Sequence, residues 1–65
     1  MILITKKQWE KMTPSSQGYV LYMQEKLPGS ELKGLKNPYP ENTRPHEEFR
    51  QGEMRAILEV QDGEE

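Results

Sequence analysis

The chain contains no cysteine and only one histidine, His46, among its 65 residues. Without cysteine it can form neither a disulfide nor a thiolate metal site, and a single histidine cannot build a zinc centre alone. A chain this short buries only about 60% of the surface that its unfolded form exposes. We therefore expect one domain spanning residues 1–65, with no metal and no cofactor, in a reducing cytoplasm.

Long hydrophobic runs are also missing. The opening MILI is followed at once by TKK and is too short for the core of a signal peptide. No later run approaches the ~18 apolar residues that a membrane span needs. We expect a soluble protein that does not use a membrane as a partner.

Catalytic motifs are missing as well: the sequence has no glycine-rich phosphate loop, no nucleophile paired with a base and no cluster of metal ligands. His46 lies beside Glu47 and Glu48, but a histidine next to two acids in a first helical turn is typical of a solvated helix start. Neighbouring carboxylates on a helix point about 100° apart, so these two cannot act on one substrate atom. We predict that the protein is not an enzyme and takes no small-molecule substrate.

The charges that are present are unevenly distributed. Residues 1–36 hold six lysines and three glutamates, a net charge of +3, whereas residues 37–65 hold three arginines and eight acids, a net charge of −5. A solvated surface accounts for most of this pattern. Oppositely charged regions also orient a small protein on a charged partner.

The first helical segment is KKQWEKM, for which Thr5 is a suitable N-cap. A helix this short rarely holds in water alone, so we expect Trp9 to pack on another element; otherwise the segment is only a turn or two. The apolar residues 2–4 equally suit the start of a strand, although no second strand is evident.

The second helical segment has a sharper start, with Thr13 as N-cap and Pro14 at the first helical position. We predict a helix from Pro14 to about Leu27, because Pro28 and the glycine after it stop the helix. Apolar residues nearly encircle it, so either both neighbours pack on it or one face binds a partner. One side carries Tyr19, Val20, Met23 and Leu27. The other side carries Gly18, Leu21 and Tyr22.

A loop, PGSELKGLK, and a stiff connector, NPYPENT, lead to the last helix. We expect Leu32 and Leu35 of the loop to cover the core. Prolines 38 and 40 force the residues before them into extended conformations, so Tyr39 should point in one direction. We predict that its ring enters the groove between the second and last helices, with its hydroxyl at the rim.

The last helix is predicted from Arg44, with Thr43 as its N-cap, to about Gln61. Its core stripe is Phe49, Ala56 and Val60, flanked by Gly52 and Ile57. Glycine costs ~1 kcal/mol relative to alanine inside a helix, so we expect the ring of Tyr19 or Tyr39 to cross close to Gly52.

Met54 and Leu58 lie on the side of this helix opposite Phe49 and would be exposed in a monomer. We predict that acidic residues around them form a polar rim that favours a basic partner surface. The rim residues are Glu47, Glu59 and Asp62. The candidate partner-binding residues are Leu21, Tyr22, Met54 and Leu58.

Together these segments predict an all-α domain of two or three helices, with a long proline-rich connector before the C-terminal helix and a disordered tail from about residue 61.

Three short motifs in a fixed order resemble the ribosome modulation factor family and its small relatives in bacteria and phages: QGY opening a helix, NPY in a connector and FRQG in the last helix. The match covers roughly residues 17–56. The resemblance implies a compact two-helix fold. Its structural signature would be Gly18, Tyr19, Pro38, Tyr39, Phe49 and Gly52.

The chain also departs from that family. Its connector is longer, and Phe49 replaces a tryptophan usual in the last helix. Ribosome modulation factor is strongly basic and binds ribosomal RNA so that ribosomes are stored inactive, whereas this chain is acidic, and its C-terminal EVQDGEE would repel phosphates.

The chain therefore more closely resembles small accessory or inhibitory proteins of phages and prophages, which bind a host protein. We expect a host-protein contact or a homodimer. The alternative is binding to the ribosome or its RNA through Lys6, Lys7, Lys11, Lys33 and Lys36.

Overall fold

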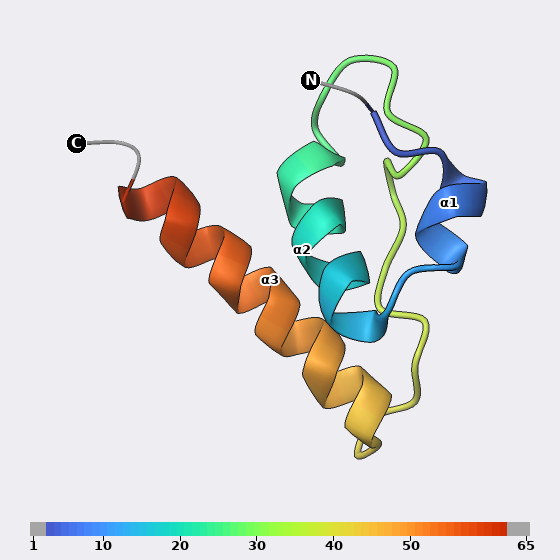
Figure 1. The fold of residues 1–65 in the computed structure, drawn as a ribbon, viewed down its shortest axis with the longest axis vertical. Helices are drawn as coiled ribbons and strands as arrows, with labels where there is room; N and C mark the ends of the chain where they lie inside the picture. Colours follow the sequence, from blue (N-terminus) through green and yellow to red (C-terminus); the bar gives the residue numbers. More distant parts are fainter. Residues whose placement is uncertain (1–2, 63–65) are drawn as a thin grey trace.

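The computed structural model describes residues 3–62 and contains three helices in that range, with no strand. These are α1 (Lys6–Glu10), α2 (Pro14–Gln24) and α3 (Arg44–Asp62). Figure 1 shows α3 crossing α2, with the C-terminal half of α3 diverging from the rest of the molecule. The predicted all-α class, with a connector before the last helix, is confirmed.

Helix α1 has only five residues and is stabilised by an N-terminal cap and by one buried side chain. The Gln8 amide N–H donates to Thr5 Oγ1 over 3.1 Å, and the Gln8 side-chain oxygen accepts from the Thr5 amide over 3.1 Å, which forms a capping box. Trp9 is buried and packs in the core, as the sequence predicted. Residues 3–5 have no regular structure, so residues 3 and 4 of the alternative strand are not in a strand, and residue 2 lies outside the described residues.

Helix α2 begins as predicted, with Thr13 as its N-cap and Pro14 at its first position. It ends at Gln24, three residues before the predicted end. The chain then tightens into turns, in which the Leu27 amide donates to the Gln24 carbonyl over 3.0 Å, because the residue before Pro28 avoids the α region. Gly29 follows with a φ of 80°, which only glycine adopts readily.

Two glycines set the contact between α2 and α3. A Cβ added to Gly52 would lie 2.0 Å from the carbonyl oxygen of Ser15, and one added to Gly18 would lie 2.0 Å from that of Phe49. Each glycine therefore faces the backbone of the other helix. The prediction that an aromatic ring crosses at Gly52 is wrong, because the backbone of α2 itself occupies that space.

The core lies where α1, α2, α3 and the connector meet. Phe49 is fully buried, and the rings of Trp9 and Tyr39 approach it edge-on, with centroids 6.3 Å and 6.4 Å away. The loop before the connector supplies Leu32, also fully buried, while Leu35 packs against the same cluster. The predicted role of these two leucines in covering the core is confirmed.

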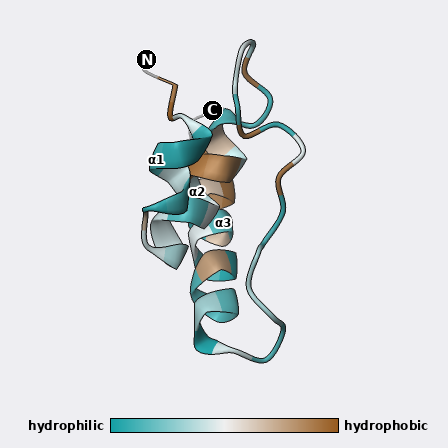
Figure 2. Ribbon diagram, turned by 90° about the vertical axis from the view of Figure 1, so that its right-hand side faces the viewer, coloured by the Kyte–Doolittle hydropathy of each residue, from teal (hydrophilic) through white to brown (hydrophobic). Residues whose placement is uncertain are grey.

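The connector runs alongside the helices as an extended segment (Figure 2). Asn37 fixes its course, because its side chain accepts from the Tyr39 amide over 3.0 Å and donates to the His46 carbonyl over 3.3 Å. Tyr39 is half-buried against Phe49, so its predicted direction is confirmed.

Helix α3 starts as predicted. The Thr43 hydroxyl accepts from the His46 amide over 3.4 Å and donates to the Pro40 carbonyl over 2.6 Å, so this cap also holds the connector. The helix includes Gln61 and Asp62 and so extends past the predicted start of the tail, while residues 63–65 lie outside the described residues. None of the helices within residues 3–62 has the length and apolar character that crossing a membrane requires.

Candidate protein-binding surface

The outer face of α3 carries the two most exposed large hydrophobic side chains described. Met54 is 53% exposed and Leu58 is 56% exposed, and they lie four residues apart on one side of the helix. The opposite side holds Phe49, Gly52 and Ala56, all buried. Met54 and Leu58 therefore lie outside the core, as the sequence predicted. The prediction that Val60 belongs to the core stripe is wrong, because Val60 is only half-buried and lines a groove near the end of α2.

A shallow groove surrounds these two residues, and we call it the outer groove. It is lined by Glu47, Arg50, Gln51, Met54, Arg55 and Leu58. Its rim is mixed in charge rather than acidic. Of the three predicted rim residues only Glu47 belongs to it: Glu59 instead accepts a hydrogen bond from the Tyr19 hydroxyl of α2, and the side chain of Asp62 lies outside what the structure describes.

The two candidate residues of α2 do not join the outer groove. Leu21 is only 2% exposed and belongs to the core cluster, so the prediction that it forms part of an exposed binding face is wrong. It lies one turn from the Gly18 contact, and the close approach of α3 and the packing of Trp9 cover this side of α2. Tyr22 is 38% exposed and lines a separate groove with Met23 and Val60.

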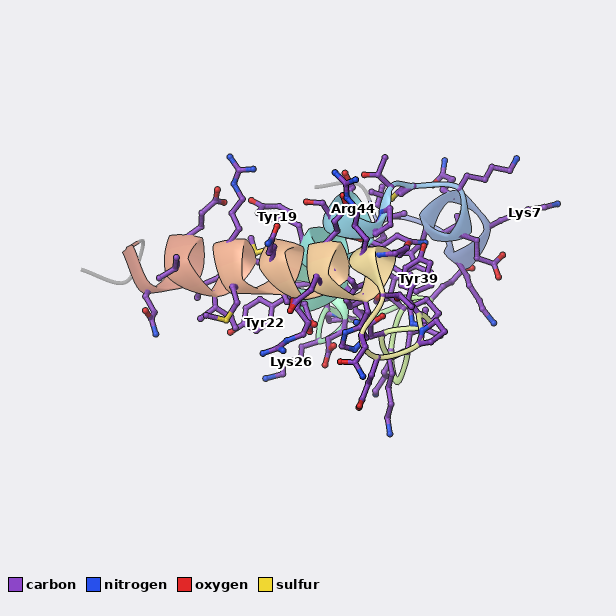
Figure 3. All side chains as sticks on the ribbon, turned by 90° about the horizontal axis from the view of Figure 1, so that it is seen from below. Lys7, Tyr19, Tyr22, Lys26, Tyr39 and Arg44 are labelled. Carbon is purple, nitrogen blue, oxygen red and sulfur yellow. The ribbon has the colours of Figure 1, made fainter. Side chains whose placement is uncertain are left out.

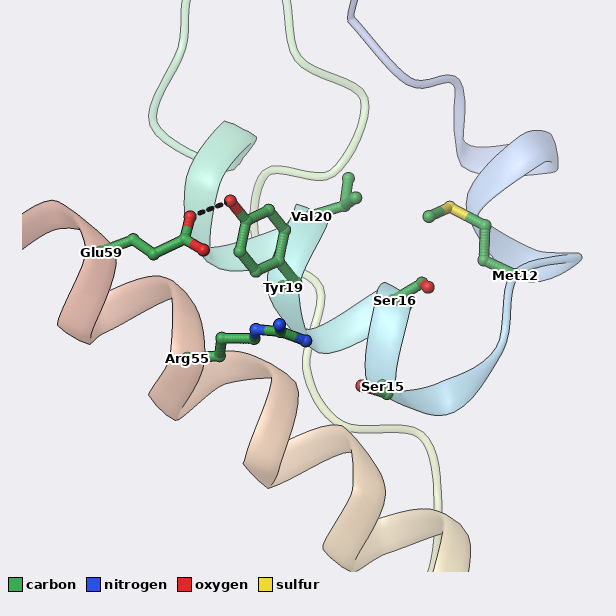
Figure 4. A pocket seen from close by; sticks show the side chains of 7 residues that line it. All are labelled: Met12, Ser15, Ser16, Tyr19, Val20, Arg55 and Glu59. Atoms are coloured by element: carbon green, nitrogen blue, oxygen red, sulfur yellow. Dashed lines mark hydrogen bonds between the residues drawn. The ribbon is translucent and has the colours of Figure 1, made fainter.

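Tyr19 lies in a third hollow, between α2 and α3 (Figure 4). Its hydroxyl donates to Glu59, and Met12, Ser15, Ser16, Val20 and Arg55 complete the lining. This hydrogen bond raises the pKa of Tyr19, since deprotonation would place two negative charges together. Figure 3 places Tyr19 and Tyr22 on opposite sides of α3, so the two hollows are distinct.

The basic residues named as an alternative site are all exposed. Lys6, Lys7 and Lys11 lie on or directly after α1, and Lys33 and Lys36 lie on the loop before the connector. The Lys6 amide donates to Glu31 over 3.2 Å, which ties α1 to that loop, and Figure 3 shows Lys7 projecting from the α1 end. The sixth lysine of residues 1–36, Lys26, lies apart from these five, in the groove that Tyr22 lines with Val60 of α3.

His46 serves the start of α3. Its amide bonds to Thr43 and its carbonyl accepts from Asn37, so its backbone anchors the connector. Within residues 3–62, no group of three or more histidine and acidic side chains is arranged to hold a metal ion.

Two buried glutamines are the main feature that the sequence analysis missed. The Gln17 side chain donates to the Trp9 backbone carbonyl over 2.8 Å and accepts from the Tyr39 hydroxyl over 2.5 Å. The backbone carbonyl of Gln17 accepts from the Trp9 ring N–H over 3.0 Å. Gln24 accepts from the Ile4 amide over 2.8 Å. Gln17 and Gln24 are seven residues apart and share a face of α2 with Leu21, and this helical spacing could have indicated that they are buried.

The Tyr39 hydroxyl therefore does not simply end at the rim, as predicted, but reaches a side chain that is 2% exposed. Gln17 connects α1, α2 and the connector through one amide group. No protein-family model, curated protein or solved structure matches the chain.

Proposed function

We propose that this protein is a non-enzymatic accessory or inhibitory protein, of the kind found in phages and prophages, and that it binds a host protein in the cytoplasm. The observation that carries the proposal is the exposure of Met54 and Leu58 on the outer face of α3. Neither residue belongs to the core cluster. Methionine adapts to different partner surfaces, and an adjacent leucine adds apolar area.

The motif residues that resemble the ribosome modulation factor family support the proposal because several of them pack inside the fold. Gly18 and Gly52 lie at the contact of the two long helices, and Tyr39 packs against Phe49. These motif residues therefore have roles in packing. They leave the outer face of α3 free for a partner.

The alternative function, binding to the ribosome or its RNA, is favoured by one observation. Five exposed lysines lie on α1, directly after it, or on the loop that the Lys6–Glu31 hydrogen bond ties to it. Phosphate contacts made by such residues would weaken steeply with added salt, whereas an apolar interface responds little.

Two variants of the full chain separate the proposals. Met54→Glu with Leu58→Glu should keep the helical circular dichroism and the thermal transition, because neither side chain is in the core, but lose the partner in a pull-down from a bacterial lysate. The matched variant changes Lys6, Lys7 and Lys11 to glutamine and should keep the partner. The reverse result, together with a steep loss of binding in salt, would replace the first proposal with the ribosomal one.

A further inference from the structure

The outer groove carries a charge pattern that specifies its partner more closely. Successive helical residues are turned by 100°, so Arg50 and Arg55 fall on opposite sides of the line through Met54 and Leu58. Both arginines line the groove and are exposed, and neither forms an ion pair with another described residue. Arg55 also lines the hollow that holds Tyr19 (Figure 4), and Glu47 is the one acid among the residues that line the outer groove. Two arginines and one glutamate thus surround the apolar centre and give the groove a net positive charge.

The apolar and polar residues along this face also follow a regular spacing. Positions 47, 51, 54, 58 and 61 alternate steps of four and three, which is the spacing by which one helix packs along another. Met54 and Leu58 occupy the middle of the row, and Glu47 lies at its N-terminal end. Since residues 3–62 contain no strand, a partner cannot dock there by extending a sheet.

We infer that the outer groove binds an amphipathic helix of another protein whose apolar stripe is flanked by carboxylates. Leucine-like side chains of that helix cover Met54 and Leu58, and its glutamates or aspartates pair with Arg50 and Arg55. Arginine forms such pairs with planar, bidentate geometry. This inference rests on the proposed function and names the chemistry of its partner.

A second copy of this chain fits the groove less well. In a symmetric dimer the same surface patch lies on both sides of the interface. Each groove carries two arginines against one glutamate, so two copies would bring surfaces of the same net positive charge together, and this is unfavourable across an interface. Charge complementarity therefore selects a different, acidic helix.

The test uses the full chain, isotope-labelled for nuclear magnetic resonance, and two synthetic peptides of about 15 residues that a side-chain crosslink holds helical. Both peptides carry leucines at i and i+4. One has glutamates at the flanking positions and the other has lysines. We expect the glutamate peptide to bind about tenfold more tightly, because its two exposed charge pairs are attractive and those of the lysine peptide are repulsive. It should also shift the amide signals around Met54 and Leu58.

Charge reversal supplies the matched control. The variant with Arg50→Glu and Arg55→Glu should reverse the preference and favour the lysine peptide. Equal binding of both peptides, binding of neither, or dimerisation of the free chain through Met54 in sedimentation would overturn the inference.

The proposed function fails in a distinguishable way. If Met54→Glu with Leu58→Glu keeps the cellular partner, the outer face is not the binding surface at all. If that variant loses the cellular partner but the two peptides bind equally well, the surface is correct and only the acidic-helix inference fails.

Discussion

The two faces of α3 differ in what they demand of their side chains. The inner face holds Phe49, Gly52 and Ala56, all buried, and an extra methyl group at Gly52 would collide with the backbone of α2. The outer face leaves Met54 and Leu58 more than half exposed. One helix thus combines a face where shape is tightly fixed with a face that tolerates change, so substitutions can separate folding from binding.

The largest expected effect is that of Phe49→Ala on the inner face. Phe49 is fully buried, and its ring contacts those of Trp9 and Tyr39, so its removal should cost about 3–5 kcal/mol of unfolding free energy. A domain of this size is expected to have only about 5 kcal/mol in total. Circular dichroism during heating should show the cooperative transition lost or moved far down. Leu58→Ala is the control on the outer face and should change stability by less than about 0.5 kcal/mol.

Gly52→Ala should have the next largest effect. Alanine gains about 1 kcal/mol in helix propensity, but its Cβ would lie 2.0 Å from the Ser15 carbonyl oxygen, so the two helices must move apart. We expect a net loss of about 2 kcal/mol in urea unfolding. Gln51→Ala, one residue away on the outer groove, should be neutral or slightly stabilising. A gain in stability for Gly52→Ala would contradict the close backbone contact.

The contrast between the faces also marks how far the sequence could be interpreted. Apolar spacing predicted that Phe49 and Ala56 are buried and that Met54 and Leu58 are exposed. It was wrong to place Val60 in the core, since this residue is only half-buried and lines a groove. The prolines predicted the direction of Tyr39. The sequence also indicated that something crosses close to Gly52. It could not identify the object as the α2 backbone, because a single sequence does not show which two glycines face each other.

Leu21 and Gln17 illustrate a second limit. Apolar residues surround α2, so periodicity did not select its buried face, and Leu21 was placed on an exposed side. Gln17 is a polar residue that is buried because the Trp9 carbonyl and the Tyr39 hydroxyl satisfy its amide. Those partners come from segments that only the tertiary structure brings together.

Tyr39→Phe tests that polar part of the core with a smaller expected effect. The ring would still pack on Phe49, but the buried side-chain oxygen of Gln17 would lose its donor, at a cost of about 1 kcal/mol. Urea unfolding should show the loss. Tyr22→Phe is the matched control, since its hydroxyl has no hydrogen-bond partner among the described residues, and it should leave stability unchanged. Equal effects from the two variants would mean that the Gln17 contact contributes nothing.

The smallest expected effect lies at Glu53, on the boundary between the two faces. Burial raises the pKa of this carboxyl above its ordinary value, and the nearby Glu25 raises it further, against the lowering effects of Arg50 and His46. A raised pKa in the folded state means that ionisation opposes folding. The neutral carboxyl contributes to the free energy of unfolding below the ordinary pKa of glutamate. This contribution is lost as the pH rises through the raised pKa of Glu53 in the folded protein.

Glu53→Gln should therefore stabilise the protein at pH 7, by about 0.3 kcal/mol because the side chain is partly exposed and solvent screens its charge. Near pH 3, where glutamates are mostly protonated, the variant and the original chain should unfold at the same urea concentration. Glu41→Gln, an exposed carboxyl on the connector, is the control and should show no such difference between the two pH values. If Glu53→Gln is instead less stable at pH 7, the attraction between Glu53 and Arg50 outweighs the cost of burying the carboxylate. Glu53 would then belong to the outer face of α3 rather than to its boundary.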